Sequence, residues 1–172
     1  KALPLLDPIH VRALVVESAD CTTAIVLCDV HSLGSEQVGH ARRLVEEQAG
    51  ILAAHVMIAC THNHAGPDTV SHGTDSGDAV RSAVVTQIAD VVAAACDQLQ
   101  EVRTGTATLD LEGIIANRRI RLPDGDSVTL RRFVPSSWEQ LKKNQVGVVN
   151  RQLTVLRLEN LSGEPIAVLT SL

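Results

Sequence analysis

Two apolar runs separated by one amphipathic segment constrain the fold of this chain more than any other feature. Residues 22–28 and 55–60 are rich in uninterrupted aliphatic side chains, a pattern typical of strands buried on both faces. Between them, residues 35–49 place apolar side chains at helical spacing, and Gly50 is a natural helix end. The sequence therefore predicts a right-handed βαβ unit with two parallel strands.

The remaining elements surround this unit and add antiparallel strands. Strands are predicted at 9–17, 104–111, 152–159 and 165–172, a helix at 78–99, a loop at 68–77, and turns at 18–20, 123–126 and 162–164. A short helix is expected near Trp138, within residues 133–147. The predicted fold class is α/β, with a mixed sheet, a parallel βαβ unit flanked by helices, and antiparallel strands after it. All 172 residues are expected to form one domain.

Composition excludes several classes of function. The net charge is −5, the basic residues form no large patch, and aromatic residues that could stack on bases are nearly absent, so a nucleic-acid partner is not expected. No stretch approaches the roughly 20 apolar residues of a transmembrane helix. The start, Lys1-Ala2-Leu3, has neither a signal-peptide pattern nor an initiator Met, as in an internal start.

The core and the cysteines are also constrained by composition. With no Tyr, one Phe and one Trp, the core must be built from Val, Leu, Ile and Ala. The four cysteines are far apart and form no C-x-x-C pair, which favours buried free thiols over a disulfide framework. They are Cys21, Cys28, Cys60 and Cys96.

Polar side chains follow both strands of the predicted βαβ unit. Asp29 and His31 come directly after the first strand, and His62 and His64 come after the second. Because parallel strands end at the same edge of a sheet, and open α/β sheets bind ligands at that edge, we expect these groups to gather there.

His62 and His64 form the most informative pair. In an extended chain, residues i and i+2 point to the same side and lie roughly 6.5 Å apart, so the two imidazoles can converge on one ion. Zinc accepts neutral imidazole at about 2.0–2.1 Å, and a catalytic site keeps one position open for water. The competing interpretation is that both histidines simply face solvent in a loop, since short motifs match often by chance.

The other candidate residues are weaker. Asp29 either caps the turn after its strand or acts as a metal ligand or as a partner that orients a histidine. Arg118 can hold an anionic or carbonyl oxygen, but the sequence alone favours a solvated cationic stretch there. His31 and His72 are interpreted as surface histidines in loops that could reach the site. Three further histidines are interpreted as structural: His10, His40 and His55.

At this point the chain resembles a known family. The segment Thr61-His62-Asn63-His64-Ala65-Gly66-Pro67 is similar to the T-H-x-H-S-G-P motif of the neutral/alkaline, non-lysosomal ceramidases. The other segments that resemble this family are 7–15 (its D-P-L-x-x-R-A-L-V-L strand), 28–30 (its apolar strand that ends in Asp), 116–119 (its N-R segment), 150–158 (a late strand) and 163–169 (a final hairpin). The resemblance covers nearly the whole chain, and its specific part is the histidine motif.

The resemblance implies a zinc amidase that cleaves the N-acyl bond of ceramide or of a related lipid amide. In the family, the first histidine of the motif binds zinc, which assigns that role to His62. The second lies beside the metal and its water, which assigns that place to His64. The arginine of the N-R segment contacts the site, which points to Arg118.

The sequence also departs from the family pattern. The family completes its zinc site with a further His, a Glu and a Tyr from later in the chain, and this sequence contains no Tyr and stops at Leu172. We therefore expect an incomplete site, in the N-terminal portion of a larger catalytic domain, with the other ligands beyond Leu172 and with weak or no zinc binding in their absence. Ala65 replaces the Ser of the motif, and Asp68 begins the segment that is Gly-rich in the family.

Two alternatives remain open. Thr61-His62-Asn63-His64 followed by Asp68 is similar to the T-H-x-H-x-D-H pattern of metallo-β-lactamase-like hydrolases, although the Asp is displaced by two positions and no His follows it. The third interpretation is a structural α/β domain without catalytic activity, in which the histidines only solvate a loop.

Overall fold

The computed structural model describes residues 7–67, 69, 75–115, 117, 119–121, 125–129 and 149–172. The chain forms two compact units, residues 1–100 and 101–172. The expectation of a single domain stays a prediction, and the two units are described separately below.

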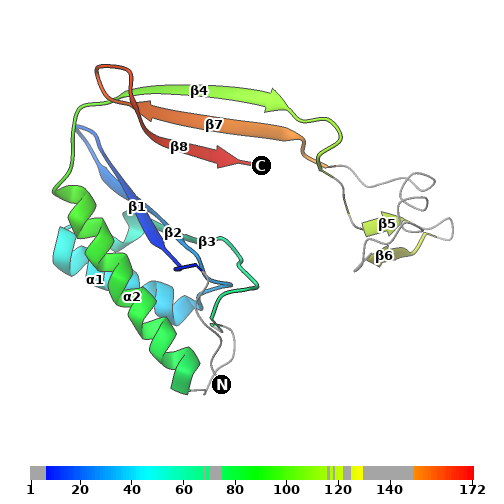
Figure 1. The fold of residues 1–172 in the computed structure, drawn as a ribbon, viewed down its shortest axis with the longest axis horizontal. Helices are drawn as coiled ribbons and strands as arrows, with labels where there is room; N and C mark the ends of the chain where they lie inside the picture. The colour runs from blue at the N-terminus through cyan, green and yellow to red at the C-terminus, as the bar shows by residue number, and fades with distance from the viewer. Residues whose placement is uncertain are drawn as a thin grey trace. The chain divides into compact units, whose positions relative to one another are not determined.

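The first unit contains a three-stranded sheet. Strands β1 (Val11–Glu17), β2 (Thr22–Cys28) and β3 (Val56–Cys60) lie in the order β1-β2-β3 (Figure 1). β1 and β2 are antiparallel, whereas β2 and β3 are parallel with Cys28 opposite Cys60. This arrangement confirms the predicted parallel βαβ unit, and β1 and β2 form an antiparallel hairpin around the turn predicted at 18–20.

Two long helices accompany this sheet. Helix α1 (Ser35–Ala49) has the predicted bounds and ends at Gly50, which adopts the left-handed conformation at φ 69° and donates its N–H to the carbonyl of Glu46. A 3₁₀ turn, η1 (Ala53–His55), leads into β3. Helix α2 (Asp75–Cys96) begins and ends three residues before the predicted helix of 78–99. The residues Asp-Ser-Gly at its start have a loop-like composition, which explains the error at that end.

Aliphatic side chains form the core between the sheet and the helices. α1 packs against α2, and α2 packs against β1, on the same side of the sheet (Figure 1). The prediction that β2 is buried on both faces is wrong, because Val26 is fully buried while Leu27 is 40% exposed. The helices bury one face of the strand, and its alternate residues face away from them. The buried cluster is formed by Val15, Ala24, Val26, Cys28, Val30, Ala41, Val45, Ile51, Val56, Val84, Val85, Ile88, Ala89 and Val92.

Helix α2 corrects a further expectation. Within it, Gly77–Cys96 is long and apolar enough by length and composition to cross a membrane, with a mean hydropathy of 1.4. The sequence was expected to hold no such stretch. A core helix of a globular domain has the same properties, and α2 places Val85, Ile88 and Val92 in the core cluster. We therefore interpret α2 as a core helix.

The second unit is dominated by antiparallel strands. Strands β4 (Arg103–Asp110), β7 (Gln152–Glu159) and β8 (Pro165–Ser171) form a sheet in the order β4-β7-β8, close to the predicted positions. A separate hairpin pairs β5 (Arg119–Arg121) with β6 (Ser127–Thr129). The mixed α/β fold class is thus confirmed. The short helix predicted near Trp138 falls outside the described residues.

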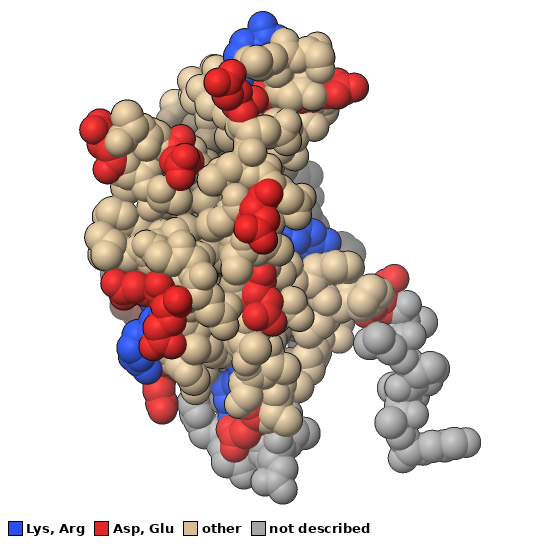
Figure 2. All heavy atoms as spheres, turned by 90° about the vertical axis from the view of Figure 1, so that its left-hand side faces the viewer, with Lys and Arg blue, Asp and Glu red and all other residues tan. Residues whose placement is uncertain are grey.

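Charged side chains are dispersed over the face shown in Figure 2. Asp and Glu side chains are spread over this face, some of them next to Lys or Arg side chains, which are fewer here. This distribution agrees with the net charge of −5.

Candidate metal centre

Two loops leave the same edge of the first sheet. The N–H of Thr61 donates to the carbonyl of Cys28 at 3.0 Å, so the pairing of β2 with β3 continues one step beyond the last residue of each strand. On the other side of β2, the N–H of Asp29 donates to the carbonyl of His10 at 2.9 Å. The segments that begin at Asp29 and Thr61 therefore start side by side, as the parallel arrangement predicts.

Three histidines gather where these loops begin. The ring centroids of His31 and His62 are 4.1 Å apart, those of His31 and His64 are 4.6 Å apart, and those of His62 and His64 are 4.7 Å apart. One ring nitrogen from each residue lies within 4.8 Å of the other two. His31 is half-buried, and the other two are exposed. The two imidazoles of the motif thus face a third one.

His31, which was interpreted as a surface histidine in a loop that could reach the site, is half-buried and lies against the rings of His62 and His64. A single histidine three residues after a strand belongs to no recognisable motif, so only its place at the sheet edge could be predicted. Its proximity to His62 depends on the lateral pairing of β2 with β3, which places Cys28 opposite Cys60. His72, which was interpreted in the same way, lies outside the described residues.

His62 is held in an unusual backbone conformation. Its φ is 61°, and no other non-glycine residue among those described has a positive φ. The left-handed region is unfavourable for a side chain with a Cβ, and such outliers concentrate at functional sites. The ring Nδ1 of His62 lies 3.0 Å from the carbonyl oxygen of His31. Because a carbonyl oxygen only accepts, Nδ1 carries the proton in this bond and Nε2 is left as a donor atom for a metal.

The rest of the motif fixes the shape of the loop. The N–H of Ala65 donates to Oδ1 of Asn63 at 2.8 Å, which closes an Asx turn directly after His62. A Cβ on Gly66 would lie 3.2 Å from Nδ2 of Asn63 and 3.6 Å from the carbonyl oxygen of Asp29. Gly66 therefore allows the two loops to approach each other closely.

Asp29 is tied to the neighbouring strand and to the second loop. Its Oδ2 accepts a hydrogen bond from Arg12 at 3.1 Å and lies 3.7 Å from Nδ1 of His10. Desolvation raises the pKa of this carboxyl. Three hydrogen bonds and the charge of Arg12 outweigh this effect and bring the pKa of Asp29 below its usual value. The hydrogen bonds come from the Arg12 side chain, the backbone of His10 and the side chain of Thr61. Asp29 thus acts on the loop through Thr61, the residue before His62.

Two thiols, those of Cys28 and Cys60, lie at the ends of β2 and β3, before the loops that carry the histidines. Burial, with smaller contributions from the nearby Cys60 and Asp29, raises the pKa of Cys28 from 9.0 to about 12. Burial also raises the pKa of Cys60, although a backbone hydrogen bond from Leu33 opposes this effect. All four cysteines are free, as predicted, but only Cys28 is buried, whereas Cys60 and Cys96 are half-buried and Cys21 is exposed. At neutral pH, Cys28 and Cys60 are therefore thiols and not thiolate ligands.

The remaining predicted residues lie away from this cluster or outside the described part. Arg118 is not among the described residues, so its predicted role stays a prediction. Nδ1 of His55 lies 3.3 Å from Sγ of Cys21, in the turn before β3. His40 lies on α1 and is exposed.

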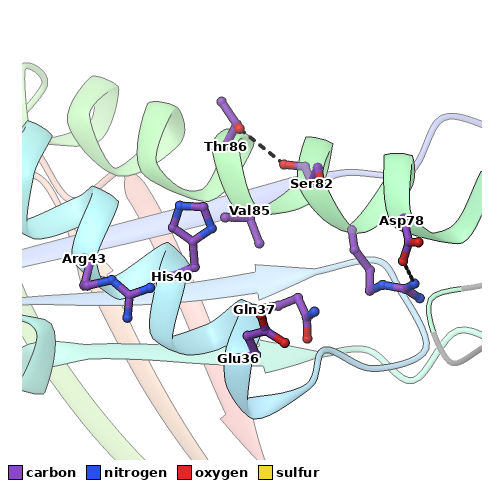
Figure 3. A pocket seen from close by; sticks show the side chains of 9 residues that line it. Glu36, Gln37, His40, Arg43, Asp78, Ser82, Val85 and Thr86 are labelled. Atoms are coloured by element: carbon purple, nitrogen blue, oxygen red, sulfur yellow. Dashed lines mark hydrogen bonds and ion pairs between the residues drawn. The ribbon is translucent and has the colours of Figure 1, made fainter. Parts of the chain in front are cut away.

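A separate polar hollow lies between α1 and α2. It has a volume of about 400 Å³, and its lining includes Glu36, His40 and Arg43 from α1 and Ser82 and Thr86 from α2 (Figure 3). None of the three clustered histidines lines it. The candidate metal centre is thus at the sheet edge and not in this hollow.

Comparisons with known proteins agree with the fold. No protein-family model matches the chain, and no curated protein matches it. A solved structure described as a ceramidase complexed with C2 matches with a TM-score of 0.61 and 22% identity, over 93% of this chain and 25% of that chain. The neutral ceramidase from Pseudomonas aeruginosa matches with a TM-score of 0.59 and 22% identity, over the same shares. The chain therefore has a ceramidase-like fold and spans about a quarter of the length of these two proteins.

Proposed function

We propose that this chain carries part of the active site of a zinc-dependent hydrolase that cleaves an amide bond, with an N-acyl lipid or a related amide as its substrate. The observation that carries the proposal is the convergence of His62 and His64 at the carboxyl edge of the sheet, with ring centroids 4.7 Å apart. The likeness of the fold to ceramidases supports the choice of an amide over other substrates.

The donor chemistry of these residues fits zinc. Neutral imidazole is a good zinc ligand, and a ligating histidine usually donates its other ring N–H to a carbonyl or carboxylate. His62 has this arrangement, because its Nδ1 lies 3.0 Å from the carbonyl oxygen of His31. His62 and His64 would hold the metal. Bound zinc supplies Lewis-acid chemistry, since it polarises a carbonyl and makes water acidic enough to be a nucleophile near pH 7.

The other residues are assigned roles toward the substrate and the attacking water. His64 is exposed and lies beside His62, where it can orient the water that attacks the amide carbon. Asp29 is a positioning residue that fixes the start of the loop through its hydrogen bond with Thr61. Arg118 would stabilise the negative charge that develops on the carbonyl oxygen. Cleavage breaks the C–N bond and releases a carboxylic acid and an amine.

The test uses the natural protein that contains these 172 residues. The zinc-loaded protein is incubated with a short-chain N-acyl sphingosine, and the released amine is quantified. We expect His62→Ala and His64→Ala to reduce the rate by at least about 100-fold, since each removes a group that acts on the reacting atoms. His40→Ala, on the exposed side of α1, serves as the matched control with an unchanged rate.

The alternatives give different results in the same assay. A β-lactam hydrolysed in place of the lipid amide would support the metallo-β-lactamase-like interpretation. Normal rates in both histidine variants, with unchanged metal content, would support the structural domain without catalytic histidines. Either result would overturn the proposal.

A further inference from the structure

We propose that His31 is a third metal ligand, so that His31, His62 and His64 form a three-imidazole site for a transition metal within the first unit. This inference rests on the metal site of the proposed function, but it does not depend on the reaction. It also differs from the expectation that zinc binds weakly or not at all without ligands from beyond Leu172, because all three proposed ligands lie within the first 64 positions.

The three rings are close enough to share one ion. In a tetrahedral zinc site with Zn–N bonds of about 2.0–2.1 Å, the ligand nitrogens lie about 3.4 Å from one another. Here the candidate nitrogens lie within 4.8 Å. Closing this difference requires movements on the order of 1 Å, and side-chain rotation of the exposed His62 and His64 is sufficient for movements of that size.

The backbone also links His31 to the site. Its carbonyl oxygen lies 3.0 Å from Nδ1 of His62, so the residue that would contribute a ring also orients the ring beside it. Nδ1 of His31 lies 3.2 Å from Oγ of Ser32, and the hydroxyl oxygen can accept a hydrogen bond from a protonated Nδ1. In both histidines Nδ1 thus lies within hydrogen-bond distance of a neighbouring oxygen, the arrangement usual for a histidine that ligates a metal through its other ring nitrogen.

The ligand set selects the class of metal. Three neutral imidazoles suit zinc, copper, nickel and cobalt, whereas magnesium and calcium require oxygen ligands. The carboxylate of Asp29, which directly follows β2, is engaged by Arg12 at 3.1 Å. Three protein ligands leave a fourth position open on a tetrahedral ion, which is the arrangement of catalytic rather than structural zinc sites.

The inference is tested by metal titration of the 172-residue chain after removal of bound metal. We expect one equivalent of Zn²⁺ to bind to the wild-type chain, and Mg²⁺ not to compete. His31→Ala should weaken Zn²⁺ binding by at least about tenfold, the scale seen when the surroundings of a metal site are damaged. Co²⁺ provides a second probe, because its visible absorption reports tetrahedral coordination. His31→Ala should weaken those bands as well.

Matched variants separate ligation from folding. His40→Ala removes a histidine outside the cluster and should bind Zn²⁺ as the wild type does. His31→Cys replaces one zinc ligand with another and should restore binding that His31→Ala loses. Wild-type affinity in His31→Ala would overturn the inference and leave the two-histidine site of the proposed function intact. Absence of Zn²⁺ binding by the wild-type chain would also overturn the inference. The proposed function is tested separately, by the amide hydrolysis assay described above.

Discussion

The ring Nδ1 of His62 lies 3.0 Å from the backbone carbonyl oxygen of His31, across the two loops that follow the parallel strands. This single contact joins residues 31 positions apart in the sequence. It sets the orientation of one imidazole by the backbone of another, so the site depends on the pairing of β2 with β3 and not only on the local motif.

The contact predicts the tautomer of His62 in the metal-free protein. Because the carbonyl oxygen of His31 only accepts, Nδ1 of His62 should be protonated and Nε2 should not be. Proton–nitrogen correlation spectra of the imidazole rings, recorded above pH 8, distinguish the two tautomers. His40, which lies outside the cluster, is the internal comparison. An Nε2-protonated ring at His62 would contradict this prediction.

The close approach at Gly66 predicts that a single methyl group will disturb the site. In Gly66→Ala the new Cβ lies 3.2 Å from Nδ2 of Asn63, so the loop that carries His62 and His64 must shift by a few tenths of an ångström. We expect metal affinity to fall severalfold, while the free energy of unfolding changes by less than about 1 kcal/mol. Isothermal titration and urea unfolding measure the two quantities.

Gly105→Ala is the control for this substitution. It adds the same methyl group to strand β4, where nothing lies within 4 Å of the new Cβ. Equal metal affinities in Gly66→Ala and Gly105→Ala would show that the loop does not need the small residue.

The raised pKa of Cys28 predicts a loss of stability at high pH. Its pKa is raised from 9.0 to about 12 in the fold, so folding favours the protonated thiol. The stabilisation is complete below pH 9 and is lost as the pH rises through 12, because the thiol of the unfolded chain ionises first. Over this range one such proton contributes a slope of about 1.4 kcal/mol per pH unit.

Urea unfolding between pH 8 and pH 11 measures this slope. Cys28→Ala should show a shallower decline than the wild type, whatever its stability at pH 8. The chain has no Tyr, so tyrosine ionisation does not contribute in this range. Parallel declines in the two proteins would refute the assignment to Cys28.

Helix α2 should contribute to stability through Ile88. This side chain is fully buried, and Ile88→Ala should lower the free energy of unfolding by about 2–5 kcal/mol. Leu99, the last residue of the helix predicted at 78–99, is 43% exposed and lies beyond the end of α2. Leu99→Ala should therefore cost less than about 1 kcal/mol. Chemical denaturation of both variants checks the contrast, and similar losses would contradict the packing described for α2.

The sequence predicted those parts of the fold that local signals determine. The bounds of α1 were predictable because its apolar spacing is regular and Gly50 follows it directly. β2 was predictable as a strand because its aliphatic run is uninterrupted, but the burial of its two faces was not predictable. Whether Leu27 is covered depends on what packs against the second face of the sheet, and an aliphatic run is compatible with either outcome.

The candidate site was predictable only where a motif marks it. His62 and His64 are two residues apart in one loop, and their separation implies proximity. His31 is close to them only through the parallel register of two strands, and the course of its loop determines whether the ring turns toward the others or toward solvent. The positive φ of His62 has no counterpart in the sequence, because histidine seldom adopts it.

The conformation of His62 favours the proposed metal site at a cost to the stability of the fold. At φ 61° glycine is the residue that the backbone accommodates most easily, yet this position holds a histidine. His62→Gly should therefore give a more stable metal-free protein than His62→Ala, by about 1 kcal/mol. In relatives that have lost the proposed metal site, glycine is therefore an expected replacement at this position. Histidine at this position in a relative would indicate that the proposed site is retained there.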